Sequence, residues 1–255
     1  RALELLPQVD RIRVGHTLLV DPVRLVRGSA ALALAGTPPQ LLPESQAADL
    51  ERAIREQAAL EMAVAERPEA HLNLSRLLLG QGKVADAEAE LRTALRLDPR
   101  NVPARVNLAD LYRGLAREAD AERLLREALG IEPNAAEVHH ALGLLCIRVG
   151  RRDEAVVHLK RAYEIGPSNP RYGYVYAICL DELGRTREAI RLLTAVQRAH
   201  PGDSDVLVAV ATYEQKLGNW TNAIGWAEKL VQQRPDDREA RALLDQLKQA
   251  APAKR

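Results

Sequence analysis

Aromatic residues are scarce in this sequence of 255 residues: phenylalanine is absent, and only 3% of the residues are aromatic. Hydrophobic residues still make up 47% of the chain, so leucine, valine and alanine must form its core. A core of mainly leucine and alanine suits closely packed helices, whereas the strands of a sheet sandwich favour aromatic residues, which are scarce here. The composition therefore predicts an all-α protein.

An excess of charge of either sign is also missing. The chain has 36 lysine and arginine residues against 35 aspartate and glutamate residues, a formal net charge of +1. Because nucleic-acid binding needs basic side chains that neutralise phosphates, no nucleic-acid partner is expected. No apolar run approaches the length of a membrane-spanning helix, so no membrane insertion is expected either.

Cysteine is limited to Cys146 and Cys179, which lie far apart and outside any Cys-x-x-Cys pattern. They indicate neither a disulfide framework nor a zinc site. Residues 1–10 lack the basic and then apolar order of a signal peptide. Because the chain begins within a helical pattern, it reads as a fragment of a longer protein. The compartment is therefore left open: periplasmic or extracellular if the parent protein is secreted, and cytoplasmic otherwise.

The sequence motifs of common enzymes are absent: there is no Gly-x-Ser-x-Gly, His-Glu-x-x-His, P-loop or dinucleotide-binding motif. His139 and His140 are adjacent on a helix and face different directions, and His71 and His158 belong to other elements. Their spacing does not supply the convergence that a metal site needs. We therefore expect no catalytic residue, no metal, no cofactor and no enzymatic activity.

What the sequence does contain is a repeat of 34 residues. Shifting the chain against itself by this period aligns five prolines and five alanines without an insertion. These two columns are Pro99, Pro133, Pro167, Pro201 and Pro235, and Ala87, Ala121, Ala155, Ala189 and Ala223.

Each repeat reads as two amphipathic helices, with apolar residues at i, i+3, i+4 and i+7. In residues 136–169, Gly150 is expected to end the first helix, and Gly166-Pro167 the second. Side chains that accept backbone N–H bonds are then expected to start the next helix. These cap candidates are Asn101, Asn134, Ser168 or Asn169, Asp203 or Ser204, and Asp236 or Asp237.

This pattern resembles the tetratricopeptide repeat family over five units, residues 68–101, 102–135, 136–169, 170–203 and 204–237. The family's small residue in the first helix is Ser75, Ala109, Gly143, Ala177 and Ala211 here. A second small position is Ala94, Ala128 and Ala162 but becomes Val196 and Leu230, so the last two units should pack differently. The resemblance implies a right-handed α-solenoid, a superhelix of antiparallel helix pairs. Residues 238–250 read as a helix that caps the last pair.

The chain before residue 68 departs from the repeat. Residues 49–67 read as one helix of a degenerate repeat, and residues 37–48 as a Pro-rich linker and domain boundary. Residues 1–36 resemble a HEAT repeat, with Asp21 as a helix cap. This order of segments is similar to the C-terminal regions of some larger bacterial proteins, multihaem cytochromes. No Cys-x-x-Cys-His motif occurs, so no haem is expected.

In tetratricopeptide superhelices the first helix of each pair lines the concave face, so the resemblance implies where a partner lies. The candidate groove residues are Asn73, Arg76, Asn107, Asp110, Arg113, His140, Arg171, Tyr174 and Thr212. The amides of Asn73 and Asn107 could hold an extended peptide backbone or be merely solvated. Tyr174 could anchor a partner or pack within the protein.

One subgroup of the family grips C-terminal carboxylates with a Lys, Asn and Arg clamp. Of the clamp positions only Asn107 matches, so this role is disfavoured. The sequence instead favours a protein–protein interaction scaffold or adaptor that binds a protein or peptide in its concave groove. The alternative is a structural spacer or oligomerisation module of a larger assembly, without an exchangeable ligand.

Overall fold

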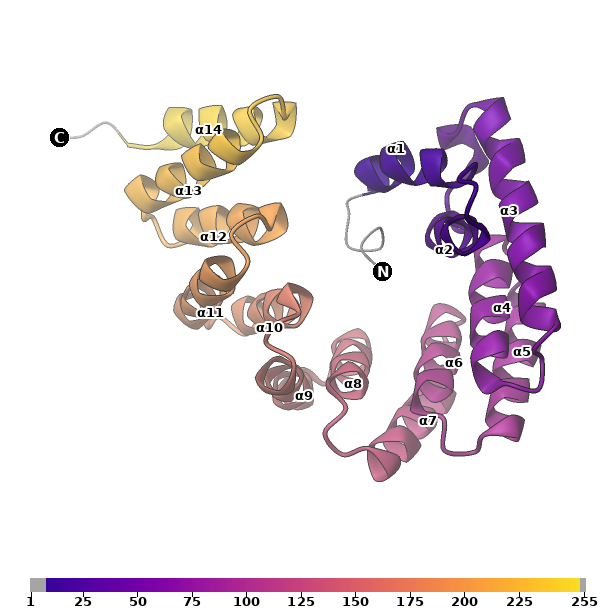
Figure 1. Ribbon diagram of the computed structural model, residues 1–255. Helices are drawn as coiled ribbons and strands as arrows, with labels where there is room; N and C mark the ends of the chain where they lie inside the picture. The colour runs from indigo at the N-terminus through magenta and orange to yellow at the C-terminus, as the bar shows by residue number, and fades with distance from the viewer. Residues whose placement is uncertain (1–7, 253–255) are drawn as a thin grey trace. The chain divides into compact units, whose positions relative to one another are not determined.

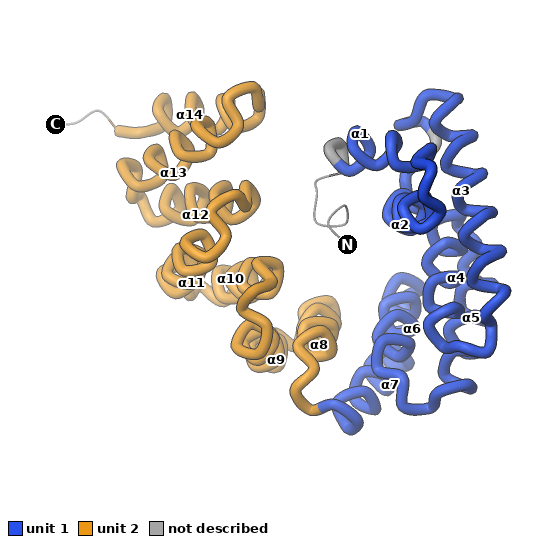
Figure 2. Tube along the Cα trace, viewed as in Figure 1, with its two compact units in different colours: residues 1–132 blue, residues 133–255 orange. Residues whose placement is uncertain are grey.

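The computed structural model describes residues 8–252, which form fourteen α-helices, one 3-10 helix and no strand (Figure 1). The chain divides into two compact units, one ending at Glu132 and one beginning at Pro133 (Figure 2). Within each unit, every helix packs against the next one along the chain. The predicted all-α solenoid is confirmed.

The helices of the first unit are α1 (Gln8–Leu18), α2 (Arg24–Leu34), α3 (Glu44–Met62), α4 (Pro68–Gly80), α5 (Val84–Leu97), α6 (Val102–Gly114) and α7 (Glu118–Ile131), with the 3-10 helix η2 (Pro39–Leu41). The helices of the second unit are α8 (Ala136–Arg148), α9 (Arg152–Ile165), α10 (Pro170–Glu182), α11 (Thr186–Ala199), α12 (Ser204–Lys216), α13 (Trp220–Gln233) and α14 (Arg238–Ala250).

The turn inside each helix pair uses left-handed backbone at one repeat position. Gly150 has a φ of +78°, and the N–H of Arg151 reaches back to the carbonyl of Cys146 at 2.8 Å. This geometry satisfies carbonyls at the end of α8, as expected for a glycine after a helix. Ala116, at the same position of the preceding repeat, adopts a φ of +56° despite its Cβ.

The two aligned columns have different structural roles. All five alanines are fully buried. The five prolines each follow the second helix of a pair, in the turn that leads to the next pair. At the small position of the first helix, a Cβ on Gly143 would lie 2.6 Å from the Leu159 side chain, so α8 and α9 approach too closely for a larger residue.

Most of the expected helix caps form. The side chains of Asn101, Asn169, Asp203 and Asp237 each accept a backbone N–H bond at the start of the next helix. The prediction is wrong for Asn134, because its Oδ1 accepts a hydrogen bond from Arg161 at 2.7 Å and Ala135 precedes α8 instead.

The valine at the second small position of the fourth repeat is matched by a glycine across from it. Val196 is 2% exposed, and a Cβ on Gly173 would lie 2.4 Å from its Cγ2 atom. In the last repeat, Leu230 is buried with Leu207 and Ala240, which belongs to α14. The extra bulk is thus absorbed by a smaller neighbour in one repeat and by the last helix in the other.

The helices before the five repeats pack onto the first of them. Leu34 of α2 and Leu50 of α3 share one hydrophobic core with Leu77 of α4. The segment 37–48 therefore connects helices of one compact unit, whereas the structure divides the chain after Glu132. The first seven residues of the HEAT-like segment lie outside the described residues, and its HEAT likeness stays a prediction.

Two local details of this segment differ from expectation. The helix expected at 49–67 is α3, which already begins at Glu44, directly after Pro43 and within the expected linker. Asp21 accepts a hydrogen bond from the N–H of Val23 at 2.7 Å, but α2 begins only at Arg24. Asp21 therefore closes a turn before the helix and does not cap it.

Two arginines of α2 bind a glutamate of α3. The Arg27 guanidinium donates to both carboxylate oxygens of Glu56, at 2.6 and 2.9 Å, and Arg24 adds a third bond at 2.8 Å. These donors, Arg27 above all, lower the pKa of Glu56 from 4.5 to about 2. Charge-assisted bonds of this two-pronged kind are among the stronger polar contacts in proteins.

The Glu56 contact predicts a loss of stability in acid. Because the folded-state pKa of Glu56 lies below its unfolded value, its contribution is present above pH 4.5 and is lost as the pH falls towards about 2. Urea unfolding of the wild type and Glu56→Gln between pH 2 and 7 should show a difference in midpoint that shrinks across that window. A difference that stays constant over the whole range would contradict this assignment.

Candidate interaction site

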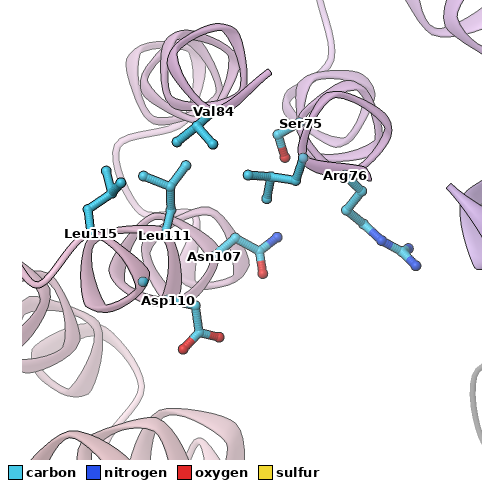
Figure 3. A pocket seen from close by; sticks show the side chains of 9 residues that line it. Ser75, Arg76, Val84, Asn107, Asp110, Leu111 and Leu115 are labelled. Carbon is cyan, nitrogen blue, oxygen red and sulfur yellow. The ribbon is translucent and has the colours of Figure 1, made fainter. Parts of the chain in front are cut away.

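A surface hollow of about 490 Å³ opens between α4 and α6, the first helices of two successive repeats (Figure 3). We call it the α4–α6 hollow. It is lined by Ser75, Arg76, Leu79, Val84, Asn107, Asp110, Leu111, Gly114 and Leu115. All of these residues belong to the first unit.

Small residues leave room for this hollow. Ser75 occupies the small position of α4, and its hydroxyl donates to the carbonyl of Leu72 at 2.8 Å, so it needs no partner from outside. Gly114 ends α6, and a Cβ built there would meet nothing within 4 Å. The space is thus bounded by the neighbouring side chains and remains open on one side.

The walls of the hollow are apolar. Leu111 is buried and faces Val84 of α5 in Figure 3, whereas Leu79 and Leu115 are 39% and 45% exposed. These two leucines expose apolar surface to water, and a ligand that covers this surface gains free energy. The hollow therefore suits an apolar side chain.

Polar groups form its rim. Asn107 is half-buried beside the leucines, and among residues 8–252 its carboxamide has no hydrogen-bond partner. Arg76 and Asp110 are exposed, with their charged ends directed outward in Figure 3. Asp110 also accepts a bond from Arg113 at 2.8 Å. The rim thus offers a free amide and charges of both signs.

Three of the nine predicted groove residues therefore meet in one hollow: Arg76, Asn107 and Asp110. Arg113 joins them through Asp110. Asn73, the repeat equivalent of Asn107, has a different environment, because its Nδ2 donates to the buried carboxylate of Glu61 at 2.9 Å.

The other four predicted residues belong to the second unit. His140 is buried with its ring 4.9 Å from the ring of Tyr172, and Tyr174 packs against two core clusters. Burial, with Asp205 and Asp203 nearby, raises the pKa of Tyr174. Arg171 and Thr212 are exposed, and the Thr212 hydroxyl donates to the carbonyl of Val208 at 2.9 Å.

Sequence reasoning missed two features. It did not identify the apolar walls, for which the available signal was an additional leucine near the end of the first helix, at Leu79 and Leu115. It also stated that the histidines do not converge, yet His139 and His158 face each other with their Nδ1 atoms 3.0 Å apart. In the described part of the chain, no three or more His, Cys, Asp or Glu residues gather as a metal-binding group.

Comparisons with solved structures support the fold. PilF from Pseudomonas aeruginosa is 20% identical over 71% of this chain and 83% of its own, with a TM-score of 0.62. MamA is 17% identical over 68% of this chain and 94% of its own, with a TM-score of 0.56. YrrB, described as a tetratricopeptide protein with an unusual peptide-binding site, is 21% identical over 72% of this chain and 93% of its own, with a TM-score of 0.54.

No curated protein matches the chain. None of the helices in residues 8–252 combines the length and apolar character that crossing a membrane requires. One tetratricopeptide repeat model matches residues 78–145 and 147–212, which is more than half of the chain, and a second matches residues 46–102. These matches support a role as a protein-interaction scaffold. The chain belongs to the tetratricopeptide repeat family.

Proposed function

We propose that this protein is a non-enzymatic interaction scaffold that binds an extended segment of a partner protein in the α4–α6 hollow. The observation that carries the proposal is the free carboxamide of Asn107 beside accessible leucines. A carboxamide supplies both a donor and an acceptor, the combination that a peptide backbone presents in return. The leucines supply the apolar contact that a polar clamp alone lacks.

The hollow favours a particular kind of segment. An aliphatic side chain of the partner fits between Leu79, Leu111 and Leu115, while its backbone runs past Asn107. The rim charges of Arg76 and Asp110 are opposite, so the site does not attract ligands by one sign of charge. We therefore expect selection by an apolar anchor residue and not by net charge.

The matched pair Asn107 and Asn73 tests this proposal. Peptides are first selected from a random library for binding to the full wild-type chain. They should bind the Asn107→Ala variant about 2- to 12-fold more weakly than the wild type, which corresponds to one lost hydrogen bond. Asn73→Ala should leave binding unchanged, because its amide is already engaged with Glu61. Fluorescence anisotropy would measure both affinities, after circular dichroism has verified equal helicity.

Two results would count against the scaffold proposal. Equal losses in both variants would place the peptide elsewhere on the repeats. Failure to select any peptide would favour the alternative role, a spacer or oligomerisation module without an exchangeable ligand.

A further inference from the structure

Large apolar side chains are exposed where α1 leads into α2. Leu25 is 78% exposed, and Val20 and Val23 are 56% and 54% exposed. A single exposed apolar side chain is normal on a protein surface, but a cluster of them is typical of an interaction site. We call residues 20–25 the α1–α2 turn. Its composition favours a role as a docking element.

The backbone of the α1–α2 turn is held in one conformation. The Nη1 atom of Arg27 donates to the carbonyl oxygens of Asp21 and Pro22, at 2.7 and 3.1 Å. The Asp21 carboxylate accepts a bond from the N–H of Val23 at 2.7 Å, and the ring of Pro22 fixes its own φ. Because the turn is already ordered, it loses little conformational entropy when a partner binds it.

The start of α2 leaves two backbone donors unused. Val23 precedes the helix, and its side chain cannot cap it. The first bonds at this end run from the N–H groups of Val26 and Arg27 to the Val23 carbonyl. In the described part of the chain, the N–H groups of Arg24 and Leu25 have no acceptor. Donors in this position are usually bound by the side-chain oxygen of Asn, Asp, Ser or Thr.

The α4–α6 hollow supplies the groups that this turn lacks. Its leucine walls suit an aliphatic side chain, and Leu25 is the most exposed large hydrophobic residue of residues 8–252. The carboxamide oxygen of Asn107 is an unused acceptor of the kind that caps helices. The hollow can therefore cover Leu25 while Asn107 accepts a backbone N–H from the start of α2.

The charges beside the two surfaces are complementary. The turn contains Asp21 and Arg24, and the Arg24 side chain is 60% exposed although it binds Glu56. The rim of the hollow contains Arg76 and Asp110, so each negative group can lie against a positive one. Because the formal net charge of the chain is only +1, two copies repel each other weakly.

We propose that the partner of the α4–α6 hollow is a second copy of this chain, which inserts Leu25 of its α1–α2 turn. This inference rests on the proposed function and names the partner. The turn and the hollow are different surfaces, so the contact is heterologous, and each pair of copies keeps one free turn and one free hollow. Association therefore continues beyond a dimer, into a filament or a closed ring.

Sedimentation equilibrium of the full chain tests the self-association. The mean mass should rise beyond that of a dimer as the concentration increases. Leu25→Arg should weaken association by about 100-fold, because it removes the anchor and places a charge against the leucines of the hollow. Val157→Arg is the matched control, because Val157 is 66% exposed but belongs to α9 of the second unit. It should associate like the wild type, and circular dichroism would verify that both variants fold.

A mixture of two deficient variants tests which surfaces meet. Leu25→Arg keeps an intact hollow, and Leu115→Arg keeps an intact turn. Neither should associate alone, whereas their equimolar mixture should form a dimer and nothing larger, because only one contact remains possible. A mixture that stays monomeric, or a Leu25→Arg variant that associates like the wild type, would overturn the proposal.

Peptide binding separates this inference from the proposed function. A selected peptide that occupies the hollow should bind Leu25→Arg as tightly as the wild type, and it should dissociate the wild-type assembly. A wild type that binds the peptide but stays monomeric at every concentration would overturn the second copy as partner and leave the scaffold proposal in place. Association that persists in saturating peptide would also overturn it. These two measurements use the wild type and need no variant to fold.

Discussion

Gly80→Ala is expected to lower the free energy of unfolding by about 1–3 kcal/mol, although alanine is the better helix former. A Cβ at this position would lie 2.4 Å from the carbonyl carbon of Ala35 and 2.5 Å from its oxygen. These are backbone atoms, so no side-chain rotation relieves the clash. The end of α2 would have to move away from α4.

Gly114→Ala provides the matched control, because Gly114 ends α6 at the same repeat position that Gly80 occupies in α4. Nothing lies within 4 Å of its Cβ position, so the substitution should stabilise the helix by up to about 1 kcal/mol. Urea unfolding would compare the two. Equal stability of both variants would contradict the close packing of α2 on the first repeat.

Hydrogen exchange would locate the damage in Gly80→Ala. Solenoids are stabilised by contacts between neighbouring elements, so protection should fall first in α1–α3 and persist in the later repeats. Such a result would show that the helices before the five repeats depend on α4 for their packing. Unchanged protection in α1–α3 would mean that they fold independently of α4.

The repeat could be predicted from the sequence because each 34-residue unit contains the residues that set its own helix contacts and helix ends. Ala155 and Gly143 are small where two helices touch. A proline follows the second helix in every unit, as Pro167 does in the third. Asn134 shows where local reasoning fails. Its side-chain oxygen accepts a hydrogen bond from Arg161, which lies 27 residues further along the chain, and not from a backbone N–H at the helix start. A competitor so distant has no signature in the local sequence.

The candidate site was predictable only in part for the same reason. The repeat position identified both Asn73 and Asn107, but the buried Glu61 that engages Asn73 lies outside the five units. Leu79 and Leu115 fit the apolar pattern of a helix, which predicts burial, although both are substantially exposed. Sequence periodicity assigns a side chain to a helix face but does not show whether a neighbour covers it.

The contact between His139 and His158 was not predicted, because only the distance between the histidines along the sequence was considered. Their positions within the repeat were not considered. The two residues are 19 apart, which places one on each helix of a pair. His71 and Glu90 have the same spacing and also meet. In a repeat protein, a contact found in one unit therefore predicts a contact at the matching positions of another.

The matched pair Leu115→Arg and Leu217→Arg tests the central claim, that the α4–α6 hollow binds the partner. Both leucines directly follow the first helix of a repeat and are 45% and 37% exposed, so an arginine can reach water in the free protein. Only Leu115 lines the hollow. In the complex, Leu115→Arg loses apolar contact worth about 1 kcal/mol, because a ligand can newly cover only the 45% of Leu115 that is exposed. It also places a charge against an apolar ligand side chain, which costs about 1–3 kcal/mol more.

The deciding measurement is the dissociation constant of one selected peptide for the wild type and these two variants, by fluorescence anisotropy at equal helicity. We predict that Leu115→Arg weakens binding by about 100-fold, while Leu217→Arg leaves it within about twofold of the wild type. Unchanged binding by Leu115→Arg, or an equal loss in both variants, would contradict the assignment of the partner to the α4–α6 hollow.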